Sequence, residues 1–117
     1  MTRALVLLTL TACVALVLTG TATARTYYAK VGPGMTITVK NASGVKVSRI
    51  PRGTHTIRVR DRSVFHNFHL IGTPDVNRRT TVPFTGLRIW TIRFVPGVYR
   101  YRCDPHRLHM HGRFTVI

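Results

Sequence analysis

Carboxylates are scarce in this sequence of 117 residues. It contains no glutamate, and its three acidic residues are Asp61, Asp75 and Asp104. General acid and base catalysis by paired carboxylates needs two acids close together, and Ca²⁺ and Mg²⁺ sites need several carboxylate oxygens. The composition therefore argues against an enzyme of that kind and against a site for a hard metal ion.

Cysteine is almost as rare, with two residues in the whole chain, Cys13 and Cys103. If Cys13 is removed with a leader, the remaining domain cannot form an internal disulfide. A single thiol exported to an oxidising compartment is a liability unless something occupies it. Cys103 is therefore either a buried, inert side chain or a metal ligand.

The N-terminal segment has the features of a secretory signal. Arg3 precedes an apolar run at residues 4–18, and Ala-Thr-Ala at residues 22–24 matches a cleavage site. We expect residues 1–24 to be a cleavable signal helix and residues 25–117 to be one exported domain without a transmembrane segment. The apolar run is short for a membrane anchor, because spanning a bilayer takes about 20 apolar residues. A lipoprotein-like sequence at residues 10–13 leaves acylation of Cys13 as an alternative.

Positive charge dominates the chain, with 18 Lys and Arg and a formal net charge of +15. A cationic surface accelerates encounters with acidic partners and loses that advantage as salt is added. We expect an acidic redox protein or an anionic surface as partner, and self-repulsion favours a monomer. No nucleic-acid-binding motif accompanies the charge.

From residue 25 onward the sequence alternates with a period of two, and Gly, Pro, Asn and Asp interrupt it. This pattern predicts short strands rather than helices. The expected strands cover residues 27–31, 35–40, 45–50, 54–60, 64–71, 79–84, 87–95, 98–103 and 113–117. Turns every eight to twelve residues indicate an all-β sandwich or barrel.

Soft metal-binding side chains gather near the C-terminus, where the spacing is Cys103-x2-His106-x3-Met110. Thiolate, imidazole and thioether suit a soft or borderline metal ion. A second imidazole could come from the segment HNFHL at residues 66–70. Two histidines, one cysteine and an axial methionine form a blue-copper site, whereas zinc sites rarely use a thioether.

Three segments resemble the cupredoxins, the family of plastocyanin-like type-1 copper domains. They are HNFHL (66–70), PGVYRYRCDPH (96–106) and MHGRFTVI (110–117). The resemblance covers the second half of the chain, and residues 27–60 match only as generic strands. It implies a Greek-key β-sandwich of about seven to nine short strands that binds one copper ion.

By the same resemblance, the copper ligands are His66, Cys103, His106 and Met110. Asn67 matches the residue whose side chain ties two ligand loops together, and His106 matches the ligand through which electrons usually leave.

His69 competes with His66 as the first ligand. Strand alternation favours His66, because it places His66 on one face with Phe68 and Leu70 and turns His69 the other way. We expect His109 and His111 to be exposed bystanders, with copper loading or partner docking as the alternative. His55 is expected to be an ordinary strand residue.

The resemblance implies an exported carrier of single electrons and not an enzyme. Its bound copper is expected to alternate between Cu(I) and Cu(II). The alternative is an extracytoplasmic protein for copper storage, delivery or tolerance that uses the same ligands. A structural or adhesive β-domain with a vacant site is a third possibility.

Overall fold

The computed structural model describes residues 11–17 and 23–117. Most of the expected signal segment, residues 1–24, lies outside the described residues, so its helix and its cleavage site stay predictions. Residues 11–17 are exposed and have no regular secondary structure. Among the described residues, no helix has the length and apolarity needed to cross a membrane.

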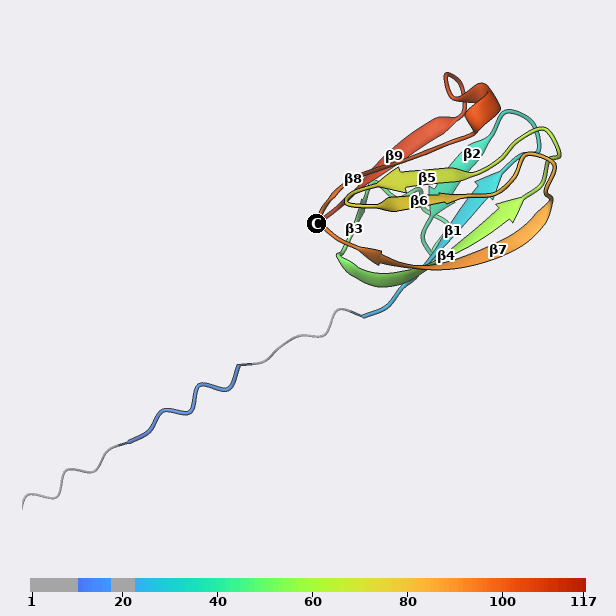
Figure 1. Cartoon of the computed structure of the whole chain (residues 1–117). Helices are drawn as coiled ribbons and strands as arrows, with labels where there is room; N and C mark the ends of the chain where they lie inside the picture. The colour runs from blue at the N-terminus through green and yellow to red at the C-terminus, as the bar shows by residue number, and fades with distance from the viewer. Residues whose placement is uncertain (1–10, 18–22) are drawn as a thin grey trace, which may run out of the picture.

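Within residues 11–17 and 23–117, nine strands form two packed sheets, which confirms the predicted all-β sandwich (Figure 1). One sheet has four strands in the order β2-β1-β4-β7, and the other has five in the order β3-β9-β8-β5-β6. The strands are β1 (Thr26–Val31), β2 (Ile37–Lys40), β3 (Arg49–Ile50), β4 (Gly53–Asp61), β5 (His69–Gly72), β6 (Val76–Arg79), β7 (Gly86–Phe94), β8 (Gly97–Arg102) and β9 (His111–Val116). A short 3-10 helix, η1 (Asp104–His106), lies between β8 and β9.

The core between the sheets is rich in aromatic side chains, because alternate residues of each strand point inward. On β7, Trp90, Ile92 and Phe94 are buried while the residues between them are exposed. On β8, Tyr99 and Tyr101 are fully buried. Each large apolar side chain removed from water contributes roughly 1.5–3 kcal/mol, so these residues supply much of the driving force for folding.

The strand expected at residues 64–71 begins only at His69. Side chains of the preceding turn account for the difference. The Asp61 carboxylate accepts a hydrogen bond from the Ser63 N–H at 3.0 Å, and the Ser63 hydroxyl accepts one from the Phe65 N–H at 3.2 Å. Such local bonds stabilise a turn and compete with strand pairing. His66 therefore lies in a connecting segment, and the alternation argument that favoured it does not apply.

The strand expected at residues 79–84 was also misplaced, since β6 covers Val76–Arg79. Thr80 uses its hydroxyl to accept a hydrogen bond from the Phe68 N–H at 2.9 Å, and Phe84 N–H bonds to the Thr81 carbonyl in a turn. The expected strand at residues 45–50 shortens to Arg49–Ile50, with an isolated bridge at Lys46.

The pairing of β8 with β9 determines where the candidate metal ligands of the C-terminal loop lie. Tyr101 pairs with Gly112 and Arg102 pairs with His111, so residues 103–110 form the connecting loop. Gly112 is required here, because a Cβ at this position would lie 2.3 Å from the Tyr101 ring. The loop and η1 lie at the end of the sandwich opposite the N-terminal segment (Figure 1).

Candidate metal centre

Backbone hydrogen bonds close the loop of residues 103–110. The Cys103 N–H donates to the Met110 carbonyl at 2.9 Å, and the His106 and Met110 N–H groups donate to the carbonyls of Cys103 and His106 at 3.1 and 2.8 Å. Pro105 suits the first turn of η1, where its missing N–H costs no hydrogen bond. These bonds hold Cys103 and Met110 side by side at the base of the loop, and both are fully buried.

His66 reaches the loop from the segment between β4 and β5. Its neighbour Phe68 is anchored by the hydrogen bond to the Thr80 hydroxyl, which in turn donates to the Asp61 carboxylate at 3.3 Å. Burial raises the pKa of Asp61, and hydrogen bonds from Ser63 and Thr80 only partly offset that effect. The segment that carries His66 is thus fixed by side-chain bonds rather than by strand pairing.

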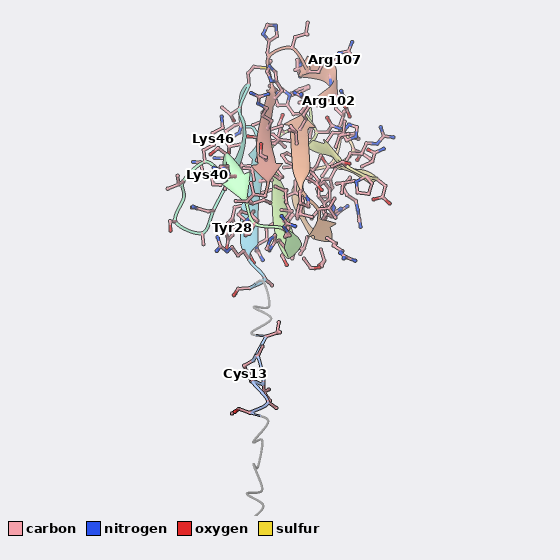
Figure 2. The ribbon with its side chains drawn as sticks, turned by 90° about the vertical axis from the view of Figure 1, so that its left-hand side faces the viewer. Cys13, Tyr28, Lys40, Lys46, Arg102 and Arg107 are labelled. Carbon is pink, nitrogen blue, oxygen red and sulfur yellow. The ribbon has the colours of Figure 1, made fainter. Side chains whose placement is uncertain are left out.

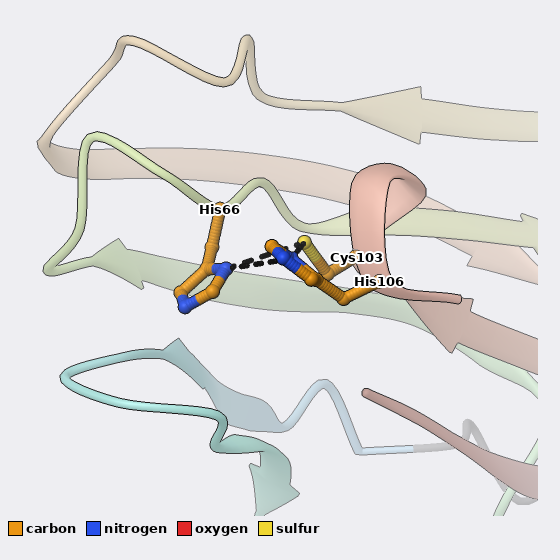
Figure 3. Close-up of side chains that lie close together, drawn as sticks. All are labelled: His66, Cys103 and His106. Atoms are coloured by element: carbon orange, nitrogen blue, oxygen red, sulfur yellow. Dashed lines mark hydrogen bonds between the residues drawn. The ribbon is translucent and has the colours of Figure 1, made fainter. Parts of the chain in front are cut away.

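Three ligand atoms from these two segments meet in a small triangle (Figure 3). The Nδ1 atoms of His66 and His106 are 3.1 Å apart, and the Cys103 Sγ lies 3.7 Å from the first and 3.6 Å from the second. His66 and Cys103 are buried, whereas His106 is half-buried. The site therefore reaches the surface on the His106 side.

The size of this triangle fits a metal ion. Protein ligands bind transition metals at about 2.0–2.1 Å through imidazole nitrogen and about 2.3 Å through thiolate sulfur. Three such ligands around one ion are separated by distances close to those observed. Met110, the fourth ligand expected from the sequence, is fully buried at the base of the loop, and its role as an axial ligand stays a prediction.

Asn67 links the two ligand-bearing segments, as the resemblance implied. Its side-chain oxygen accepts the Asp104 N–H at 2.7 Å, and its side-chain nitrogen donates to the Asp104 carboxylate at 2.8 Å and to the Thr80 carbonyl at 3.1 Å. The Asn67 backbone N–H lies 3.5 Å from the Cys103 Sγ. An N–H directed at sulfur stabilises a thiolate and tunes a metal bound to it.

His69 points away from the triangle. Its Nδ1 lies 2.8 Å from the Asp104 carboxylate, and its Nε2 lies 2.6 Å from the Asn77 side-chain oxygen. Both ring nitrogens are therefore already hydrogen-bonded. Asp104 also accepts a bond from Arg102 Nε at 3.0 Å. This role of Asp104 was not predicted from the sequence. The signal for it was the position of an acid directly after Cys103 in a chain with three acids.

The three donors around Asp104 change its acidity. Partial burial acts to raise the pKa of the carboxyl group, but hydrogen bonds from His69, Asn67 and Arg102 outweigh it and lower the pKa from 3.8 to about 2. The carboxylate therefore stays ionised at any ordinary pH and holds the loop next to Cys103.

Replacing Asp104 with asparagine should lower the unfolding free energy of the metal-free protein by about 2 kcal/mol near neutral pH. The pKa of this group is lower in the folded than in the unfolded chain, so its ionised form stabilises the fold above about pH 4. The difference in unfolding free energy between wild type and variant should disappear as the pH falls from about 4 to about 2. Denaturant titrations of both proteins across this range test the prediction, and a difference that stays constant with pH would refute it.

The remaining histidines lie apart from the triangle. His109 and His111 are exposed on either side of Met110, in agreement with the expectation. His55 is buried on β4, where its Nδ1 accepts the Arg25 N–H at 3.0 Å and its Nε2 lies 2.8 Å from the Pro51 carbonyl. His55 thus joins the start of β1 to the core.

The two-sheet sandwich and the His66, Cys103 and His106 cluster between its connecting segments define the chain as a domain with the cupredoxin fold. Three solved cupredoxins illustrate the similarity. Rusticyanin from Thiobacillus ferrooxidans is 23% identical, with a TM-score of 0.54 over 79% of this chain and 76% of rusticyanin. Dithionite-reduced auracyanin from Roseiflexus castenholzii is 19% identical, with a TM-score of 0.56 over 82% of this chain and 99% of auracyanin. An oxidised mutant of amicyanin is 16% identical, with a TM-score of 0.52 over 77% of this chain and 80% of amicyanin.

No protein-family model and no curated protein sequence matches the chain.

Proposed function

We propose that this protein is a type-1 copper protein that carries single electrons between redox partners and makes no bonds in a substrate. The observation that carries the proposal is the triangle formed by His66, Cys103 and His106, in which a thiol and two imidazoles from two segments of the chain face one another. Rusticyanin is described as a copper protein, and the auracyanin and amicyanin structures are described as reduced and oxidised. Those names support a redox role for a domain of this fold.

We assign His66, Cys103, His106 and Met110 as the copper ligands, with one copper ion per chain. Bound copper would supply a one-electron couple between Cu(I) and Cu(II), for which thiolate and imidazole suit both states. The chain's own contribution is rigidity. The hydrogen bonds of Asn67 to Asp104 hold the two ligand-bearing segments at a fixed separation, which limits rearrangement when the charge changes. His106 is the half-buried ligand and therefore the proposed exit for the electron.

We further propose that the protein is exported, with residues 1–24 as a cleaved signal, and that it acts as a monomer. The apolar run and the Ala-Thr-Ala site at residues 22–24 support export. The net charge of +15 supports the monomer and an acidic or anionic partner.

A second function, copper storage or delivery, is favoured by the exposed His109 and His111 on either side of Met110. Imidazoles at the surface could pass copper to or from the buried site.

Electron exchange and copper transfer separate the two functions. An electron carrier should show a reversible one-electron wave in protein-film voltammetry and should keep its copper when mixed with a competing apo-protein. Loss of copper to the acceptor within the mixing time, together with sluggish electron exchange, would contradict the carrier function. The variant His109→Ala/His111→Ala should leave the voltammetric wave unchanged, because neither residue belongs to the triangle.

A further inference from the structure

A groove of about 500 Å³ lies on the outer face of the five-stranded sheet, beside the loop of residues 103–110. We call it the arginine groove. Its lining includes three arginines and one histidine together with two apolar side chains: Arg100, Arg102, Arg107, His111, Ile71 and Leu108.

Strand register concentrates positive charge on this face. Arg100 on β8 pairs with Arg113 on β9, and Arg102 pairs with His111. Like charges directly opposite each other destabilise a sheet, so the Arg100–Arg113 pair weakens the fold on its own. Within residues 11–17 and 23–117, the ion pairs all involve Asp104, which contacts Arg102 and His69. The charges of Arg100 and Arg113 are not balanced by an acidic side chain of the described chain.

The arginine groove is adjacent to the metal centre through the chain itself. Three of its residues are direct neighbours of assigned ligands, in the pairs Arg102–Cys103, His106–Arg107 and Met110–His111. Figure 2 shows Arg102 and Arg107 at the end of the domain opposite the N-terminal segment that carries Cys13. A molecule bound in the groove would therefore contact residues that directly adjoin three of the assigned ligands in the chain.

The chemistry of the groove fits a protein surface that carries carboxylates. Arginine binds carboxylates with two parallel hydrogen bonds and is enriched in protein interfaces. Leu108, with 79% of its surface exposed, supplies an apolar contact within the charged surround, which is the usual arrangement of an interface. The groove is concave, a shape suited to protruding side chains rather than to a flat membrane.

From these observations we propose that the arginine groove is the docking surface for an acidic redox protein. This inference rests on the proposed electron-carrier function and adds where the partner binds. The acidic side chains of the partner would neutralise Arg100 and Arg107 and bring its redox centre close to the Cys103–His106 loop.

Electron transfer to two forms of one probe protein tests the proposal. The probes are succinylated cytochrome c, which is acidic, and unmodified cytochrome c, which is cationic. Stopped-flow mixing with the copper-loaded protein measures the passage of one electron between copper and haem iron, in which one metal is oxidised and the other is reduced. The groove variant is Arg100→Glu/Arg107→Glu. The matched control is Arg60→Glu/Arg93→Glu, which makes the same change in net charge at exposed positions of β4 and β7.

At low ionic strength, the groove variant should react with succinylated cytochrome c at least about tenfold more slowly than wild type. The electron-transfer rate of the control variant should fall by less than about threefold. Added salt should remove the difference between the two variants. Equal losses in both variants would overturn the proposal, because net charge alone would then explain the rates. Binding to phosphatidylglycerol vesicles that is lost in the groove variant, with an unchanged cytochrome rate, would also overturn it in favour of a membrane surface.

A second measurement is independent of copper. Reduced succinylated cytochrome c should shift the NMR signals of residues 100–113 in the metal-free protein and leave β4 and β7 unaffected. If the protein fails to bind copper but these shifts occur, the electron-carrier function is wrong and the docking surface stands. If copper binds with the expected colour and the shifts fall elsewhere, the docking surface is wrong.

Discussion

Replacing Cys103 with serine is expected to abolish the intense visible absorption of the Cu(II)-loaded protein. That band requires charge transfer from a thiolate to copper, and a serine hydroxyl is neither ionised at ordinary pH nor soft enough to substitute. Cys103 is fully buried, and its sulfur lies 3.6–3.7 Å from both imidazoles of the triangle. Among the described residues, no second thiol lies near the triangle, because the other cysteine, Cys13, is in the exposed N-terminal segment.

Serine is close to cysteine in size, so the variant should fold, and far-ultraviolet circular dichroism checks that it does. Cys13→Ser in the full-length chain is the matched control and should keep the full colour. Visible absorption that survives in Cys103→Ser would show that the thiolate is not a copper ligand and would remove the basis of the type-1 assignment.

Replacing His66 with alanine should also remove the colour, whereas replacing His69 with alanine should leave the visible band in place. The Nδ1 atom of His66 faces the triangle, 3.1 Å from that of His106. Both ring nitrogens of His69 are occupied by Asp104 and Asn77. The loss of a hydrogen bond to the Asp104 carboxylate should cost His69→Ala about 1.5–3 kcal/mol of stability instead.

Added imidazole provides the control for this pair of variants. It should restore colour to His66→Ala by entering the space left by the side chain, and it should have no effect on His69→Ala. If His69→Ala alone lost the visible band, the ligand assignment would be reversed and the geometry of the triangle would not represent the copper site.

The candidate ligands of the 103–110 loop could be proposed from the sequence because their spacing is local. Cys103, His106 and Met110 lie within one short connection, and the alternation of Tyr99 and Tyr101 predicted the strand that leads into it. The pattern of alternation likewise predicted the two-sheet core around Trp90, Ile92 and Phe94, because burial on one face of a strand has a period of two.

The strand-alternation argument that favoured His66 as the first ligand does not hold. Alternation requires a strand, and the hydrogen bonds of Asp61 and Ser63 form a turn that delays β5 until His69. The resemblance to cupredoxins at HNFHL was the sounder argument. Hydrogen bonds from side chain to backbone are not visible in a pattern of apolar and polar residues, so the start of this strand could not be predicted from the pattern.

The link between Asp104 and His69 could not be predicted for a different reason. The two residues are 35 positions apart, and their contact depends on the pairing of His69 on β5 with Arg102 on β8. In the sequence, Asp104 before Pro105 is typical of a turn, and His69 is one of several histidines near a ligand. The register of the sheet is what brings His69 and Asp104 within hydrogen-bonding distance.

Titration of the metal-free protein with Cu(II) tests the central claim most directly. The account predicts an intense visible thiolate-to-copper band that rises linearly and stops at one copper per chain. A colourless complex, or copper binding with no end point at one equivalent, would contradict the assignment of His66, Cys103, His106 and Met110 as a type-1 copper site.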